Sequence, residues 1–352
     1  QYETALQYFR QGQLIMENNH LSEHPDMATC FNNIGSALKE LQQYQEAWNM
    51  YEKAKTLRER TLGPHHSNTA ACYLLIGMLL VAQKEYDRAI EYIEHARKIR
   101  EMILGEKDVE TALCYSYAGH ILMLQKCYDQ ALYFYELARK IDFDLYGSNH
   151  PETVQCDENI ANLKLQLGYT QDALKIMYRI AKYKKQFHGE NHPCTATIYN
   201  NIGNVLRSQC RNDAALRMYK KARKIYETVY GFFHHSTGVV YANIGHVHFW
   251  SGNFKDALDM YLQSNSIRER LNGRLHKSFA MGLHNLVMTY KKLKQQRTAL
   301  KYAEDLQQLL KDMKVHTNNS DQELVNLNTL NDKTIAKLLR KIRMSGGRNV
   351  RL

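Results

Sequence analysis

The sequence predicts an all-α fold, a solenoid of helix-turn-helix repeats closed by a C-terminal capping helix. Three observations support this prediction. The 352 residues include only 4 Pro and 18 Gly, which favours helix along the chain. A 42-residue period runs through the sequence. Within each period, apolar residues recur at three- and four-residue spacing on either side of a short polar turn, the pattern of two amphipathic helices.

The register of the period is set by eight alanines spaced 42 residues apart: Ala5, Ala47, Ala89, Ala131, Ala173, Ala215, Ala257 and Ala299. A second column holds small residues: Gly35, Gly77, Gly119, Ala161, Gly203 and Gly245. A glycine inside a helix costs about 1 kcal/mol relative to alanine, so its repetition predicts close helix-helix approach there. A third column marks the links between repeats: Gly63, Gly105, Gly147, Gly189, Gly231 and Gly273.

Each repeat therefore consists of helix A, a tight turn, helix B and a glycine-containing link. In the repeat that contains Tyr199, we expect helix A over 193–208 and helix B over 213–230. Basic pairs such as Arg97-Lys98 are expected at the end of helix B, where they favour the negative end of the helix dipole. Because one repeat cannot bury its own apolar faces, neighbouring repeats must stack.

The array divides into four predicted parts. Residues 1–20 form a half repeat, which is helix B of a truncated repeat, and 21–314 form seven full repeats. A capping helix follows over 315–344, because Ser320 and Glu323 form a capping box and apolar residues then recur at helical spacing. Residues 345–352 form a basic flexible tail. Since the pattern starts in helix B, we expect the chain to be an excerpt of a longer protein.

The formal net charge is +11, and the last twenty residues hold seven Lys and Arg without an acid. This distribution predicts a body that is only mildly basic. No run approaches 18 apolar residues and the N-terminus lacks signal-peptide character, so neither a membrane span nor secretion is expected. Seven cysteines, an odd number, favour a reducing compartment, and a cytoplasmic location is predicted.

The repeats resemble a known family. Tyr-x-x-Ala-Leu following a helix that carries Asn201-Ile202-Gly203 resembles the tetratricopeptide repeat. The 42-residue period and the links Gly147-x-x-His150-Pro151 and Gly189-x-x-His192-Pro193 resemble the kinesin light chain type over residues 1–313. Asp108-Val109 departs from that link. The resemblance implies a right-handed superhelix acting as a cargo adaptor, with short peptides bound in a concave groove. Kinesin light chains also carry an N-terminal coiled coil, and no sustained heptads appear here.

In such arrays helix A lines the groove, and the position two before the glycine column points into it. That column reads Asn33, Leu75, Tyr117, Asn159, Asn201, Asn243 and Asn285. An Asn side chain both donates and accepts hydrogen bonds, so it can bind the backbone of an extended peptide. The alternatives are a solvated polar face or hydrogen bonds between repeats.

Neighbouring inner positions predict a groove with two halves. The N-terminal half is apolar, with Leu74, Leu75, Met78, Leu113, Tyr117 and Met123. The C-terminal half is polar and basic, with Asn162, Asn200, Asn204, Arg207, His246, His284 and Lys291, and with an aromatic step at Phe249 and Trp250. A peptide with an aliphatic or aromatic anchor and flanking acids would match this groove. Another segment of the parent protein is an alternative occupant of the apolar half.

Histidines and cysteines invite metal chemistry, but their spacing favours structural roles. His24, His66, His150, His192, His234 and His276 share one column and are expected to cap helix A or to pack under the link. Cys30, Cys72, Cys114 and Cys156 also share one column and are expected to pack as small apolar residues. No phosphate loop, Gly-x-Ser-x-Gly or His-Glu-x-x-His occurs. We therefore expect no metal, no cofactor and no catalysis.

The leading functional hypothesis is a cytoplasmic adaptor whose groove binds a peptide segment of partner proteins. The second is a regulatory or assembly module that packs on its own domains or self-associates. Nucleic acid is not expected as a partner, because the basic tail with Lys337, Arg340, Lys341 and Arg343 lacks interleaved aromatic residues. That tail is either a solvated face or a contact for acidic protein, lipid or RNA phosphate.

Overall fold

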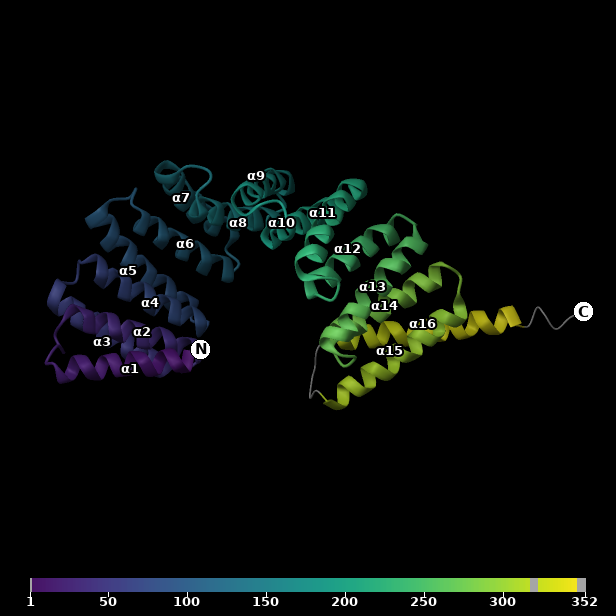
Figure 1. Ribbon diagram of the computed structural model, residues 1–352, viewed down its shortest axis with the longest axis horizontal. Helices are drawn as coiled ribbons and strands as arrows, with labels where there is room; N and C mark the ends of the chain where they lie inside the picture. Colours follow the sequence, from purple (N-terminus) through teal and green to yellow (C-terminus); the bar gives the residue numbers. More distant parts are fainter. Residues whose placement is uncertain (1, 317–321, 347–352) are drawn as a thin grey trace, which may run out of the picture. The chain divides into compact units, whose positions relative to one another are not determined.

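The computed structural model describes residues 2–316 and 322–346, and within these ranges it contains sixteen α-helices and no strand (Figure 1). Seven A helices have 16 residues each: α2 Pro25–Glu40, α4 Ser67–Ala82, α6 Val109–Leu124, α8 Pro151–Gln166, α10 Pro193–Ser208, α12 His235–Trp250 and α14 Lys277–Lys292. The B helices alternate with them: α1 Tyr2–Asn18, α3 Tyr44–Leu62, α5 Tyr86–Leu104, α7 Tyr128–Tyr146, α9 Thr170–His188, α11 Asn212–Tyr230, α13 Phe254–Asn272 and α15 Gln296–His316. The final helix is α16 Gln322–Gly346.

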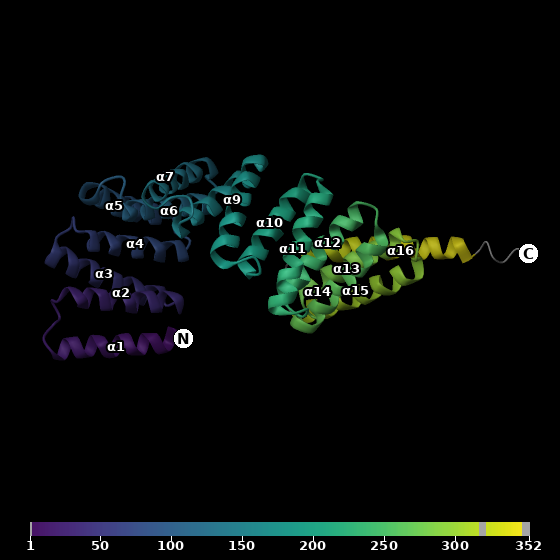
Figure 2. The same cartoon turned by 45° about the horizontal axis from the view of Figure 1, so that its top comes forward.

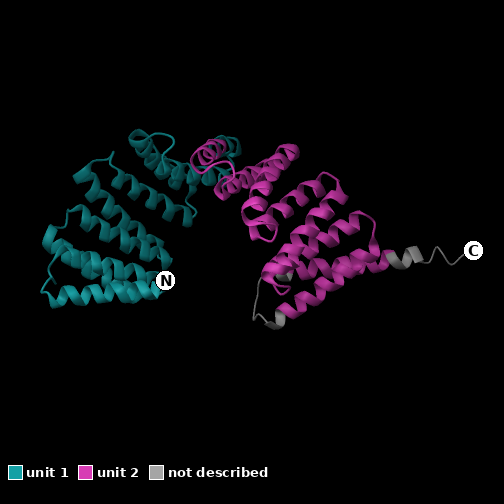
Figure 3. Cartoon of the chain, in the orientation of Figure 1, with its two compact units in different colours: residues 1–177 teal, residues 178–352 magenta. Residues whose placement is uncertain are grey.

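The chain forms two compact units, residues 1–177 and residues 178–352, and the division falls within α9 (Figure 3). In unit 1, each helix from α1 to α7 packs against the next, as Figure 2 shows, and α2 also contacts α4. In unit 2, α10 to α16 pack in the same sequential way, and α10 also contacts α12. These two contacts place α2 beside α4 and α10 beside α12.

The repeat columns form the cores. The alanine column from Ala47 to Ala299 is fully buried, and the residue four positions later fills the space beside it, as Tyr51 and Tyr219 do. The glycine column allows this packing. A Cβ atom at Gly203 would lie 2.6 Å from a ring carbon of Tyr219, closer than side chains tolerate. The predicted all-α repeat solenoid is therefore confirmed, and so is the reason for its glycines.

The histidine column caps the A helices, as predicted. In α10, Nδ1 of His192 accepts a hydrogen bond from the backbone N–H of Cys194 at 3.2 Å. His24, His66, His150, His234 and His276 make the equivalent bond, and Asp108 replaces histidine with a carboxylate acceptor at 2.8 Å. Each of these side chains satisfies one N–H group that the first helical turn leaves free.

The prediction for the end of helix B was wrong. Arg97 lies in the middle of α5, where it pairs with Glu94 and Glu101, and the last turn of α5 holds no basic residue. The link is held instead by a buried arginine that the sequence analysis missed. Arg58 donates from Nη1 to the carbonyl of Asn68 at 2.7 Å. Arg100 and Arg268 reach the carbonyls ten residues later, at 2.8 and 3.0 Å.

The charge follows the division into units. Unit 1 contains 17 Lys and Arg against 24 Asp and Glu, a net charge of −7. Unit 2 contains 30 Lys and Arg against 12 Asp and Glu, a net charge of +18. Residues 1–332 carry a formal net charge of +4, so the expectation of a mildly basic body is confirmed for their sum, but this sum combines an acidic unit with a strongly basic one.

The last helices close unit 2. α15 extends to His316 and α16 begins at Gln322, later than the start that the sequence suggested. α16 packs on α15: Leu338 is buried, and Asn331 donates to the carbonyl of Ala303 at 2.8 Å. Ser320 of the expected capping box and residues 347–352 of the expected tail lie outside the described residues. Along the described ranges, no helix combines the length and hydropathy needed to cross a bilayer.

Candidate functional site

The predicted site residues lie on the A helices, and we call the solvent-facing side of these helices the A face of each unit. In unit 1 the A face belongs to α2, α4, α6 and α8, and in unit 2 to α10, α12 and α14. Asn33 is exposed, and the six other members of the predicted column are half-buried: Leu75, Tyr117, Asn159, Asn201, Asn243 and Asn285. These positions can therefore contact a ligand while remaining anchored in the array.

The A face of unit 1 is apolar at its centre. Leu75 and Met78 of α4 are half-buried, and so is Tyr117 of α6. Leu113 and Leu124 extend this surface along α6 with 41% and 37% of their area exposed. Leu74 and Met123 do not belong to it: Leu74 is buried in the core, and Met123 packs against a second core cluster. Side chains that follow a helix at three- and four-residue spacing share a face, and their neighbours turn inward.

Amide side chains border this apolar centre. Asn33 on α2 and Asn162 on α8 are exposed, and Asn159 is half-buried. The arrangement offers a hydrophobic floor with hydrogen-bonding groups on both flanks, which matches an extended peptide that carries an apolar side chain.

In unit 2, asparagines on the A face connect neighbouring helices. Asn243 of α12 donates to Oδ1 of Asn200 on α10 at 2.9 Å. Asn285 of α14 lies 3.3 Å from Nε2 of His246, whose neutral ring accepts the hydrogen bond. Asn204 accepts from the hydroxyl of Tyr219 at 2.8 Å. Hydrogen bonding between repeats, one of the alternatives raised by the sequence, therefore occupies part of the polar column.

Beside these amides lies a partly buried cationic cluster. Burial, together with the charges of Arg207 and Arg268, lowers the pKa of His246 to about 4. The Nε of Arg207 is buried without a hydrogen-bond partner. Burial also lowers the pKa of Arg268, a residue of helix B that the sequence analysis missed. Arg268 already donates to the carbonyl of Ser278, so Arg207 is the guanidinium that this face offers to an anion, and its burial strengthens the attraction because less water screens it.

An aromatic and basic edge continues this face. The Trp250 indole is 76% exposed and meets Phe249 edge-to-face, with ring centroids 5.7 Å apart. Lys291 is half-buried, and its pKa is lowered by burial and by Lys337, Lys341 and Lys292. His284 is also half-buried, and its Nδ1 lacks a hydrogen-bond partner. α16 thus adds cations to the surface that α12 and α14 begin.

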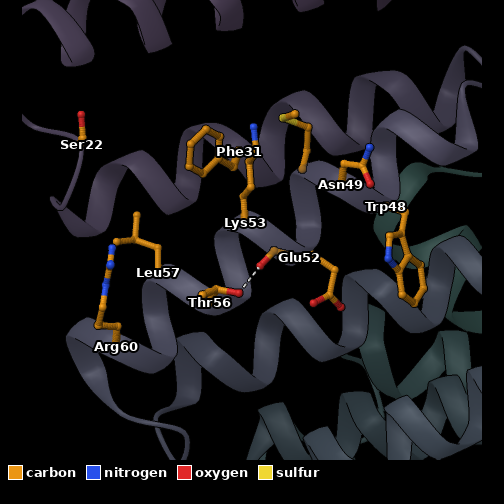
Figure 4. A pocket seen from close by; sticks show the side chains of 10 residues that line it. Ser22, Phe31, Trp48, Asn49, Glu52, Lys53, Thr56, Leu57 and Arg60 are labelled. Atoms are coloured by element: carbon orange, nitrogen blue, oxygen red, sulfur yellow. Dashed lines mark hydrogen bonds between the residues drawn. The ribbon is translucent and has the colours of Figure 1, made fainter.

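A hollow between α2 and α3 of unit 1 could not be predicted from the repeat pattern of the sequence. It has a volume of about 660 Å³ and lies along α3, with Trp48 and Arg60 at opposite ends (Figure 4). Phe31 of α2 forms part of its wall, and Lys53 lies 5.9 Å from the centre of that ring. Its residues change from repeat to repeat, so only the folded arrangement brings them together.

Cysteine and histidine behave as structural residues. All seven cysteines are free, and Cys72, Cys114 and Cys156 are buried while Cys30 is half-buried. Among the described residues, no group of three or more His, Cys, Asp or Glu is arranged to hold a metal ion.

The repeats match models of a known family. Tetratricopeptide repeat models match residues 1–60, 31–102 and 157–228, and a second model of that repeat matches residues 237–276, together more than half of the chain. The chain belongs to the tetratricopeptide repeat family. Such repeats indicate a protein-interaction scaffold. No curated protein sequence matches the chain.

Solved structures share the fold. One is designated as nearly identical TPR-like repeats of a Podosopora anserina kinesin light chain, with 16% identity over 59% of this chain and 98% of that one, and a TM-score of 0.53. The apo form of RapI has 15% identity over 97% and 96% of the two chains, with a TM-score of 0.61. A STAND ATPase from Pyrococcus horikoshii with a tetratricopeptide repeat sensor has 11% identity over 96% of this chain and 48% of that one, with a TM-score of 0.61.

Proposed function

We propose that the chain is a cytoplasmic, non-enzymatic adaptor of the kinesin light chain type, whose A faces bind extended peptide segments of partner proteins. The 42-residue repeat and the fold shared with kinesin light chain repeats support this proposal. The observation that carries it is the pairing of half-buried amides with Arg207, whose buried Nε lacks a hydrogen-bond partner, on the A face of unit 2.

The A face of unit 2 selects an acidic residue. Arg207 supplies the charge on this face, and Asn201 lies six residues before Arg207 in the same helix, available to a peptide backbone. Since guanidinium groups bind carboxylates in a bidentate manner, Asp or Glu is the expected side chain.

The A face of unit 1 selects an apolar residue. Leu75, Met78 and Tyr117 remain partly exposed in the free chain, and a bound aliphatic or aromatic side chain would remove this area from water. A partner that uses both faces would thus carry an apolar anchor and acidic residues, and several modest contacts would share the affinity.

A selection from a random peptide library, displayed on phage, tests the proposal. The chain is compared with two variants, Arg207→Gln and Tyr117→Ala. We expect acidic residues to be enriched by the chain and by Tyr117→Ala, and apolar anchors to be enriched by the chain and by Arg207→Gln. Asn243→Ala is a less useful variant, because it also breaks the hydrogen bond to Asn200.

Lys301→Gln on α15 removes an exposed charge away from the A face and serves as the control. It should select the same peptides as the unaltered chain. Identical selections by the chain and by both A-face variants would reject the assignment of these faces.

An assembly function is the second candidate, and an exposed apolar patch on unit 1 favours it. Side chains at the ends of α5 and α7 are 40% to 62% exposed: Met102, Ile103, Leu104, Phe143, Leu145 and Tyr146. Exposed apolar patches of this kind mark association surfaces. Sedimentation velocity of the chain and of an Ile103→Glu/Leu145→Glu variant tests it, with a concentration-dependent oligomer expected only for the unaltered chain.

A further inference from the structure

The exposed side of α11 in unit 2 carries four cations on one helical face. Arg217, Lys220, Lys221 and Lys224 are all exposed. Their spacing of three, four and seven residues places them on one side of the helix. We call these four residues the basic face of α11. The face belongs to a B helix, so it is separate from the A face discussed above.

Few acids lie near this face in the sequence. Residues 178–230 contain eleven Lys and Arg but only Glu190, Asp213 and Glu227. Glu190 pairs with Lys185 at 3.1 Å, and Glu227 accepts from the hydroxyl of Tyr241 at 2.6 Å. The same columns of α9 hold Arg179 and Lys182, which are also exposed. Like charges one turn apart destabilise a helix by a few tenths of a kcal/mol per pair, so the free chain does not benefit from this arrangement.

The environment of the basic face distinguishes among anionic partners. At the positions of the basic face and their equivalents in α9, the aromatic residue is the exposed Tyr178. Beside the face, Nζ of Lys221 lies 5.4 Å from the ring centre of Tyr199. Successive stacking platforms, which single-stranded nucleic acids use, are not formed by this pair. The face also lacks the large apolar side chains that insert into a bilayer interface.

We infer that the basic face of α11 binds an acidic, extended polypeptide segment of a partner protein. Alternate side chains of an extended chain lie about 7 Å apart, close to the helix pitch of about 5.4 Å. Every second carboxylate of the segment can therefore meet Arg217, then Lys220 or Lys221, and then Lys224. The net charge of +18 on unit 2 speeds the encounter through long-range attraction.

Binding of a fluorescein-labelled polyglutamate peptide to the full chain, followed by anisotropy at low and physiological salt, tests this inference. The variant Lys220→Glu/Lys221→Glu/Lys224→Glu should lose at least tenfold in affinity. The matched control Arg297→Glu/Lys301→Glu/Lys311→Glu changes the net charge equally on exposed positions of α15, and it should lose less than threefold. The neutral variant Lys220→Gln/Lys221→Gln/Lys224→Gln should lose an intermediate amount, and circular dichroism verifies that every variant is folded.

The inference is overturned by equal losses in the α11 and α15 variants, by the absence of binding at low salt, or by unaltered affinity in the α11 variants. It is also overturned if oligouridylate, or vesicles containing phosphatidylserine, bind the basic face at least tenfold more tightly than polyglutamate. Arg207→Gln should retain polyglutamate binding to α11, so failure of this inference and failure of the A-face proposal remain distinguishable.

Discussion

Units 1 and 2 share one backbone plan but differ in charge and in surface chemistry. Both alternate A helices of 16 residues with B helices of 19 residues, and both use the same alanine column at their cores. Yet unit 1 carries −7 and unit 2 carries +18. The A face of unit 1 centres on Leu75 and Tyr117, whereas that of unit 2 contains Asn243 and Arg207.

This difference teaches which positions of the repeat are constrained by folding. A position whose side chain fills the space between helices must keep its volume, so Ala47 and Ala215 are the same residue in both units. A position on a solvent-facing side contributes little to stability and can change its chemistry. The array is therefore one scaffold with two surfaces of different chemistry.

The largest expected effect compares one glycine of each unit, Gly203 and Gly77, and depends on whether the glycine faces a tyrosine or an isoleucine. In unit 2, a methyl group at position 203 would lie 2.6 to 3.0 Å from three atoms of the rigid Tyr219 ring. In unit 1, a methyl group at position 77 meets the Cδ1 end of Ile93 at 2.8 Å, and that flexible side chain can rotate away. Gly203→Ala should lower the free energy of unfolding by about 2–3 kcal/mol, while Gly77→Ala should change it by less than about 1 kcal/mol.

Hydrogen–deuterium exchange in increasing urea, read by mass spectrometry, follows the two units separately and checks this difference. Ala161→Gly serves as a control, because the fourth repeat already accommodates a methyl group at that column. If Gly77→Ala and Gly203→Ala lowered the free energy of unfolding equally, the facing residue, Ile93 or Tyr219, would not determine the cost.

A smaller effect concerns pH and unit 2. The pKa of His246 is lowered to about 4 in the folded chain from its ordinary 6.5. The folded state therefore binds fewer protons between these values, and the resulting stability is present above pH 6.5 and is lost as the pH falls toward 4. Between pH 7.5 and 5, this loss amounts to about 2 kcal/mol. His246→Asn should remove that part of the pH dependence.

Urea unfolding of the chain and of His246→Asn at both pH values measures the difference. Asp142 of unit 1 provides a contribution of opposite sign, since burial raises the pKa of its carboxyl. Because the folded state binds this proton more tightly, acidification stabilises unit 1 through Asp142. Asp142→Asn should remove this gain in the free energy of unfolding at low pH. A His246→Asn variant with an unaltered pH profile would contradict the assignment.

The sequence could predict the scaffold because its columns repeat. Ala215, Gly203 and His192 each recur every 42 residues, so helix order, packing and capping follow from one repeat. The surface could not be predicted in the same way. Arg207 and Arg268 come from different helices, α10 and α13, and only packing brings them near His246. The link arginines were missed because a buried charge is recognised only when its acceptor, such as the carbonyl of Asn68, is known.

The smallest expected effect concerns the turn between helices A and B. One position of this turn has a positive φ in both units, at Lys126 of unit 1 with 64° and at Gly252 of unit 2 with 81°. An L side chain is strained there, and glycine is not. Lys126→Gly should raise the free energy of unfolding by about 0.5–1 kcal/mol, and Gly252→Lys should lower it by a similar amount. Thermal unfolding of the two variants measures both changes, and a loss of stability in Lys126→Gly would mean that the lysine side chain contributes more to the turn than its backbone strain removes.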